Sequence, residues 1–137
     1  MYLKSIMEFA INLAENSNSV PVAAVITLNN QIISYATNSK HNIWEHAELL
    51  AIQNAQNVDL SKCEIYITLE PCMFCSALLN ITKIQNIYFG AYNRLDSGLL
   101  SLLPKLSYIQ NNSKIIGGLH ETSCQHLLTQ HFERVRG

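Results

Sequence analysis

The chain has 137 residues, of which 48% are hydrophobic, and a formal net charge of −1. This length and composition predict one compact domain over residues 1–137 with a full hydrophobic core. They exclude a membrane-spanning protein, because no apolar run is long enough to cross a bilayer. The first segment also lacks the basic start and the cleavage site of a signal peptide, so we expect a cytoplasmic protein without a membrane partner.

Apolar side chains recur at helical spacing over residues 2–15 and predict an amphipathic helix. Residues 20–28 predict a buried strand, and Asn29-Asn30 a two-residue turn into a second strand at 31–35. Further along we expect helices over 46–57, 72–81 and 121–134, a short helical pattern from Leu99 to Leu103, and strands over 63–69, 86–89 and 114–116. Helices and strands that alternate in this way predict a three-layer α/β/α fold, in which helices cover both faces of a mixed sheet.

Two short stretches carry the residues that predict chemistry, His46-Ala47-Glu48 and Pro71-Cys72-Met73-Phe74-Cys75. Two cysteines at i and i+3 share one face of a helix, and one imidazole with two thiolates is a ligand set that Zn²⁺ prefers. Pro71 suits the first position of the second helix, whose N-terminus favours the thiolate form. Three protein ligands leave one tetrahedral position for water, which is typical of a catalytic zinc.

Glu48 lies two residues after His46, an offset that separates the two side chains on a helix. We therefore expect Glu48 to reach the water beside the metal and to carry protons, rather than to be a fourth ligand.

These residues match the H-x-E and P-C-x-x-C signature of the zinc-dependent nucleobase deaminases. The whole chain resembles the bacterial tRNA adenosine deaminases, which convert the wobble adenosine of a tRNA anticodon to inosine. The resemblance also includes Val20-Pro21-Val22-Ala23-Ala24-Val25, Asn38, Thr68-Leu69-Glu70, Phe89-Gly90-Ala91, Leu127-Leu128, Phe132 and Arg134.

The resemblance implies a cytidine-deaminase-like fold with a five-stranded sheet, one Zn²⁺ per chain, a homodimer, and the anticodon stem-loop of a tRNA as the partner, with no DNA partner. It implies that Asn38 and Val20 contact the nucleoside and that Ala47 gives the base room near the metal. By the same resemblance, Phe132, Arg134 and Arg136 on the last helix contact the RNA. Core packing is the alternative for Phe132, which lies on the apolar stripe of that helix with Cys124, Leu127 and Leu128.

Two alternatives remain open from the sequence. The first is a deaminase of a free base or nucleotide, such as guanine, cytosine or deoxycytidylate, since those enzymes use the same ligands and the net charge of −1 does not favour RNA. The second is a structural zinc module closed by a fourth ligand from His41, Cys63 or His120. Three segments depart from the resembled family: Asn42-Ile43-Trp44-Glu45, Asn93-Arg94-Leu95-Asp96-Ser97 and His131-Phe132.

Overall fold

A computed structural model describes residues 1–93, 98 and 113–136 of the chain. In chain order its elements are α1 (Lys4–Glu15), β1 (Ala23–Leu28), β2 (Gln31–Thr37), α2 (Ala47–Asn54), the 3-10 turn η1 (Leu60–Lys62), β3 (Glu64–Leu69), α3 (Met73–Thr82), β4 (Asn86–Ala91), β5 (Lys114–Ile116) and α5 (Glu121–Arg136). The helical pattern predicted from Leu99 to Leu103 lies outside the described residues.

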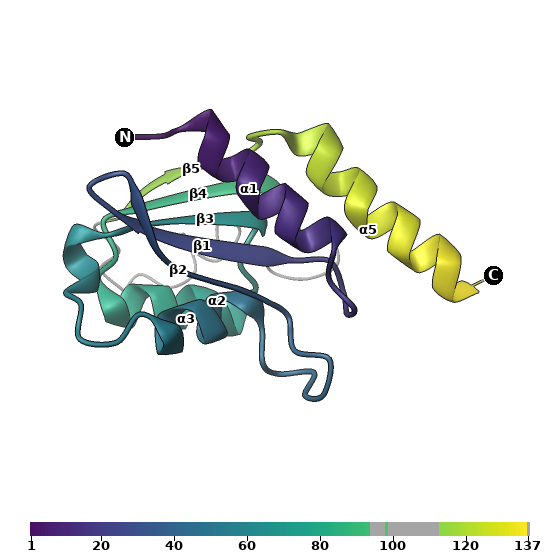
Figure 1. Ribbon diagram of the computed structural model, residues 1–137, viewed down its shortest axis with the longest axis horizontal. Helices are drawn as coiled ribbons and strands as arrows, with labels where there is room; N and C mark the ends of the chain where they lie inside the picture. The colour runs from purple at the N-terminus through teal and green to yellow at the C-terminus, as the bar shows by residue number, and fades with distance from the viewer. Residues whose placement is uncertain (94–97, 99–112, 137) are drawn as a thin grey trace.

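The five strands form one sheet in the order β2-β1-β3-β4-β5. β1 pairs antiparallel with both β2 and β3, whereas β3, β4 and β5 run parallel, so the sheet is mixed. Helices α1 and α5 cover one face of the sheet and α2 and α3 the other (Figure 1). The structure therefore confirms the predicted three-layer α/β/α fold.

The opening hairpin turns at Asn29 and Asn30, as predicted. Both residues have positive φ, 51° and 63°, and asparagine tolerates this left-handed conformation better than most residues. Two left-handed residues in a row match the twist of the strands that they join. The turn thus sets the register of β1 and β2, with Leu28 opposite Gln31.

The central strands are buried on both faces, because residues alternate between two cores. Ile65 and Ile67 of β3 pack toward α2 and α3, whereas Tyr66 between them packs toward α1. Ile87 and Tyr88 of β4 alternate in the same way. Each layer of helices therefore has its own apolar core, and the sheet is held from both sides.

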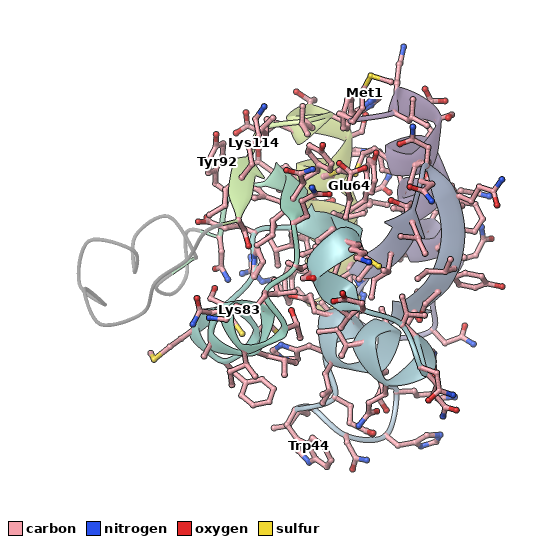
Figure 2. The ribbon with its side chains drawn as sticks, turned by 90° about the vertical axis from the view of Figure 1, so that its left-hand side faces the viewer. Met1, Trp44, Glu64, Lys83, Tyr92 and Lys114 are labelled. Carbon is pink, nitrogen blue, oxygen red and sulfur yellow. The ribbon has the colours of Figure 1, made fainter. Side chains whose placement is uncertain are left out.

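A polar cluster fastens the start of the chain to the sheet. The Glu64 carboxylate accepts hydrogen bonds from the Met1 amino group (2.7 Å), Asn86 Nδ2 (2.6 Å) and the Tyr88 hydroxyl (2.7 Å). Figure 2 shows Met1 and Glu64 at the same end of the molecule. Burial raises the pKa of the Glu64 carboxyl, but the hydrogen bonds and the ammonium outweigh it and leave the pKa lower than usual.

Some sequence predictions differ from the structure at element ends. α2 ends at Asn54 instead of near Asn57, whose φ of 61° is left-handed and not helical. β4 continues to Ala91, beyond Gly90. Phe132 is 41% exposed and does not belong to the core, because the last turns of α5 extend past the sheet (Figure 1).

Among the described residues, no helix combines the length and apolarity needed to span a bilayer.

Candidate active site

The two predicted ligand stretches lie at the N-termini of neighbouring helices. His46 is the residue before α2, with extended backbone dihedrals, and Cys72 holds the same position before α3. The prediction that Pro71 occupies the first helical position is wrong by two residues, since α3 begins at Met73. Cys72 instead precedes the helix, and its backbone carbonyl accepts a hydrogen bond from the Ser76 N–H at 2.8 Å. Cys75 follows in the first turn of the helix. The helix dipoles therefore point their positive ends at the same place.

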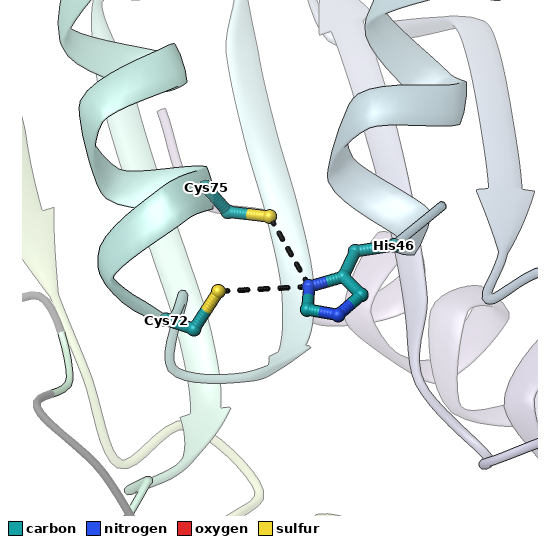
Figure 3. A group of neighbouring side chains, drawn as sticks. All are labelled: His46, Cys72 and Cys75. Atoms are coloured by element: carbon teal, nitrogen blue, oxygen red, sulfur yellow. Dashed lines mark hydrogen bonds between the residues drawn. The ribbon is translucent and has the colours of Figure 1, made fainter. Parts of the chain in front are cut away.

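The three side chains converge on one point (Figure 3). His46 Nδ1 lies 3.5 Å from Cys72 Sγ and 3.5 Å from Cys75 Sγ. Zinc bonds of about 2.3 Å to sulfur and about 2.0–2.1 Å to nitrogen, at a tetrahedral angle, place nitrogen and sulfur about 3.6 Å apart. The donor set and its spacing therefore fit Zn²⁺.

The two thiols form a proton-sharing pair. The pKa of Cys72 falls to about 5, chiefly because the Cys75 thiol donates a hydrogen bond to it, with help from backbone N–H groups and His46. The same interaction and burial raise the pKa of Cys75. Thiolates are the form in which both cysteines would hold a divalent cation, and the lowered pKa of Cys72 favours that form.

The alternative of a closed structural site predicted a fourth ligand from His41, Cys63 or His120. Within the described part of the chain, the only cluster of three or more potential metal ligands is His46, Cys72 and Cys75. The residues outside the described part contain neither histidine nor cysteine. The structure therefore does not support a His- or Cys-closed module.

Glu48 lies in the first turn of α2 and is 4% exposed. The pKa of the Glu48 carboxyl is raised to about 7, chiefly because the side chain is buried. A backbone hydrogen bond lowers this pKa, and the negative charge of Cys72 raises it further. As predicted, the side chain lines the same pocket as His46 and Cys72.

That pocket has a volume of about 470 Å³, within the range of about 300–1,000 Å³ typical of small-molecule sites. Its walls include the predicted residues Val20 and Asn38 above the metal ligands. Ala47 does not line it. Its side chain is fully buried and belongs to the core on the α2 side of the sheet.

Asn38 has a structural role that the sequence did not indicate. Its Oδ1 accepts the Ala47 backbone N–H at 2.8 Å and so satisfies one of the unpaired donors at the start of α2. This hydrogen bond assigns the oxygen of the amide, and because Asn38 lines the pocket, its NH₂ group is the donor that the residue can offer there.

The pocket wall also includes Glu70, to which the sequence assigned no chemistry, and His131, which lies in one of the three segments that depart from the resembled family. Glu70 is 4% exposed, and its carboxylate accepts the Asn93 backbone N–H at 3.0 Å. His131 comes from α5, which packs on the opposite face of the sheet. The helical pattern of residues 121–136 does not show that this position reaches the site, but the departure from the resembled family at His131-Phe132 pointed to it.

The predicted RNA contacts lie around a second, smaller pocket that shares Ser19 and His131 with the first. Arg134 lines this pocket of about 260 Å³, and Phe132 is half-exposed nearby on the same helix. Arg136 is exposed at the end of α5. The structure thus places all three on one helix that borders the candidate site.

A family model described as the cytidine and deoxycytidylate deaminase zinc-binding region matches residues 2–91. These residues contain all three candidate ligands and Glu48. The fold and the site therefore define a zinc-dependent deaminase domain.

Curated relatives narrow this class. A tRNA-specific adenosine deaminase of Aquifex aeolicus is 34% identical over 131 residues, which is 90% of this chain and 87% of the relative. A tRNA-specific adenosine deaminase of Bacillus subtilis is 29% identical over 149 residues, which cover 99% of this chain and 89% of the relative. The chain belongs to the tRNA-specific adenosine deaminase family.

Solved structures agree on the fold. One, from a study of A-to-I editing by tRNA:A34 deaminases, is 23% identical with a TM-score of 0.80 and covers 92% of this chain and 100% of that chain. A guanine deaminase from Nitrosomonas europaea is 20% identical with a TM-score of 0.78, and the match covers 95% of this chain and 84% of that chain. Since fold alone does not separate these activities, substrate has to be argued from the site and the relatives.

Proposed function

We propose that this protein hydrolyses the wobble adenosine of a tRNA anticodon loop to inosine and ammonia. The observation that carries the proposal is the convergence of His46, Cys72 and Cys75 beside the buried Glu48, at one pocket of nucleoside size. The relatives named as tRNA-specific adenosine deaminases support the substrate.

His46, Cys72 and Cys75 would hold one Zn²⁺ per chain, with the imidazole binding through Nδ1, the atom that faces both sulfurs. Zinc bound there supplies Lewis-acid activation of water. The ligand side chains extend from the N-termini of α2 and α3, which are held by the backbone hydrogen bonds Leu50 N–H to His46 O and Ser76 N–H to Cys72 O.

Glu48 carries protons in this scheme. It takes one from the attacking water and delivers it to the substrate, so that the amino group on the purine carbon leaves as ammonia. Its position suits this role because the carboxylate is buried, lines the pocket and lies within one helical turn of His46.

Asn38 and Val20 hold the nucleoside. The Asn38 NH₂ group donates a hydrogen bond to the nucleoside, while Val20 packs against it. Ala47 contributes only through its backbone N–H, which orients Asn38.

An anticodon-loop base can enter such a pocket, because it is unpaired and leaves its stack at low cost. Phe132, Arg134 and Arg136 contact the RNA around it. A second copy of the chain packs on α3, where Met73, Phe74 and Ile81 are 53%, 53% and 73% exposed. One domain over residues 1–137 carries the whole activity, and the enzyme acts in the cytoplasm.

The proposal is tested with Glu48→Ala, assayed on an anticodon stem-loop with adenosine at the wobble position. We expect inosine formation to fall by a factor of at least about 10²–10⁴, the usual contribution of a general acid–base group, while bound zinc stays near one per chain. Glu8→Ala on α1 is the matched control, since its side chain is 56% exposed and makes only an i,i+4 ion pair with Lys4.

Loss of zinc together with activity in Glu48→Ala would mean that Glu48 is a ligand, and the mechanism would be wrong. Activity of the wild-type enzyme on free guanine, cytosine or deoxycytidylate, but not on the stem-loop, would replace the proposed substrate by that of the rival class. Removing zinc with a chelator should abolish activity, and adding Zn²⁺ back should restore it.

A further inference from the structure

The loop between β2 and α2 exposes two large apolar side chains at the edge of the catalytic pocket. Ile43 is 94% exposed and Trp44 is 59% exposed. Figure 2 shows Trp44 projecting into solvent, at the end of the molecule opposite Met1 in that view. Exposed large apolar groups in a polar loop cost solubility, and their clustering beside a site marks a contact surface.

The loop is continuous with the pocket. Lys40, Asn42 and Ile43 line the pocket itself, and Trp44 follows Ile43 directly. The Trp44 carbonyl accepts the backbone N–H of His46 at 3.0 Å, so its backbone is tied to a metal ligand. Trp44 therefore stands between two residues that line the pocket, Ile43 and, two positions later, His46.

Local hydrogen bonds hold the loop in shape. The Ser39 N–H donates to the Glu45 carbonyl (2.9 Å), and the Glu45 N–H donates to the Asn42 carbonyl (3.1 Å). Asn42 Nδ2 also donates to the Glu45 carboxylate at 2.5 Å. The one acidic side chain of the loop is therefore engaged within the loop, and the indole is presented by an ordered backbone.

We propose that Trp44, with Ile43 beside it, is a stacking platform for the nucleotide next to the target base in the RNA. This inference rests on the proposed function. A target base that enters the pocket leaves its neighbour unstacked at the rim, and an exposed aromatic ring replaces the lost stacking. Lys40 and His41 precede the platform and supply groups that can meet the adjoining phosphate.

The charge of the chain makes stacking important here. With nine lysines and arginines against ten acidic residues, phosphate neutralisation gives little overall attraction for RNA. Affinity then depends more on contacts that do not need net positive charge, and base stacking is such a contact.

A second copy of the chain fits this loop less well. A stable protein interface needs about 800 Å² from each partner, whereas a tryptophan buries at most about 250 Å². Met73, Phe74 and Ile81, which are assigned above to the contact with a second copy, belong to a different element, α3. Trp44 and Ile43 are of the size of one nucleobase platform.

Trp44 is the only tryptophan in the chain, so its fluorescence reports on this one position. We would titrate zinc-loaded Glu48→Ala enzyme, which does not consume the substrate, with the wobble-adenosine stem-loop and with a fully paired duplex of equal length. We expect the stem-loop to quench and shift the emission and the duplex to leave it unchanged.

Kinetics on the zinc-loaded enzyme, with Glu48 intact, give the second readout. Trp44→Ala should raise KM for the stem-loop by about 5- to 140-fold, which corresponds to the loss of about 1–3 kcal/mol of stacking per base, with kcat within about threefold. Trp44→Phe should recover most of the loss. Tyr35→Ala is the control, because Tyr35 is an aromatic residue of similar exposure (52%) whose ring packs against Phe9 of α1, on the sheet face opposite α2.

Unchanged emission at saturating stem-loop, or a Trp44→Ala KM equal to that of Tyr35→Ala, would overturn the platform while leaving the proposed function intact. The platform would also be overturned if the emission changed with protein concentration but not with RNA, and if Trp44→Ala sedimented as a monomer where the wild type is a dimer. Trp44 would then contact a second copy of the chain. Suppose that the stem-loop quenches the emission of Glu48→Ala but the enzyme with Glu48 intact forms no inosine from it. That result would support the platform and refute the wobble-adenosine substrate instead.

Discussion

Asn38 offers a substitution pair that separates its structural contact from its proposed contact with substrate. Aspartate keeps an oxygen that can accept the Ala47 N–H, but it lacks the NH₂ donor. Alanine lacks both. The two variants should therefore differ in stability and agree in loss of activity.

The stability difference follows from the hydrogen bond between Asn38 Oδ1 and the Ala47 N–H, which is 2.8 Å long. Ala47 is fully buried, so Asn38→Ala leaves an N–H without a partner and without access to water. Such a donor costs about 1–3 kcal/mol, and a lost helix cap costs about 0.5–2 kcal/mol. For a chain of this length we expect Tm to fall by about 3–8 °C. Asn38→Asp should keep the wild-type Tm or exceed it slightly, because a carboxylate is favourable at a helix N-terminus.

Activity should behave differently. Without the donor, both variants lose a hydrogen bond of about 1–3 kcal/mol to the nucleoside, which lowers kcat/KM on the stem-loop by about 5- to 140-fold. Thermal unfolding and inosine formation, measured on the same zinc-loaded preparations, give the two readouts. Full activity of Asn38→Asp would refute the contact with substrate, and an unchanged Tm of Asn38→Ala would refute the capping argument.

Two further predictions concern stability. The Glu64 carboxyl has a lowered pKa in the folded state, so its stabilising effect is complete above the unfolded value of about 4.3 and is lost as pH falls through the folded value. Glu64→Gln should therefore lower the free energy of unfolding by about 1–2 kcal/mol at pH 7, measured with denaturant, and this difference from wild type should shrink toward pH 3. A difference that does not change with pH would contradict this reasoning. A Cβ on Gly117 would overlap the Phe89 ring, so Gly117→Ala should lower the unfolding free energy by about 1–3 kcal/mol, and an unchanged midpoint would show that the ring moves aside freely.

Features encoded by neighbouring residues could be predicted from the sequence. Asn29-Asn30 specified its turn locally, and the helix ends at His46 and Cys72 were recognisable from the residues around them. Boundaries were less accurate, because the residue that precedes a helix has extended dihedrals that a pattern of residue types does not reveal.

Contacts between distant residues could not be predicted. The position of Glu70 before Pro71 favours an extended backbone but says nothing of its side chain, which is buried and accepts a hydrogen bond from the backbone N–H of Asn93, 23 positions later. Phe132 continued an apolar stripe but is exposed, because α5 outruns the sheet on which its first turns pack. In both cases the deciding partner is set by the tertiary arrangement, which propensity and periodicity do not contain.

The wall that His131 adds to the pocket comes from the final helix, whereas the metal ligands and Glu48 all lie between positions 46 and 75. The last helix therefore contributes to the pocket wall without contributing a candidate metal ligand or Glu48. A substitution at His131 would change the shape and polarity of that wall while leaving in place the side chains that would hold the metal.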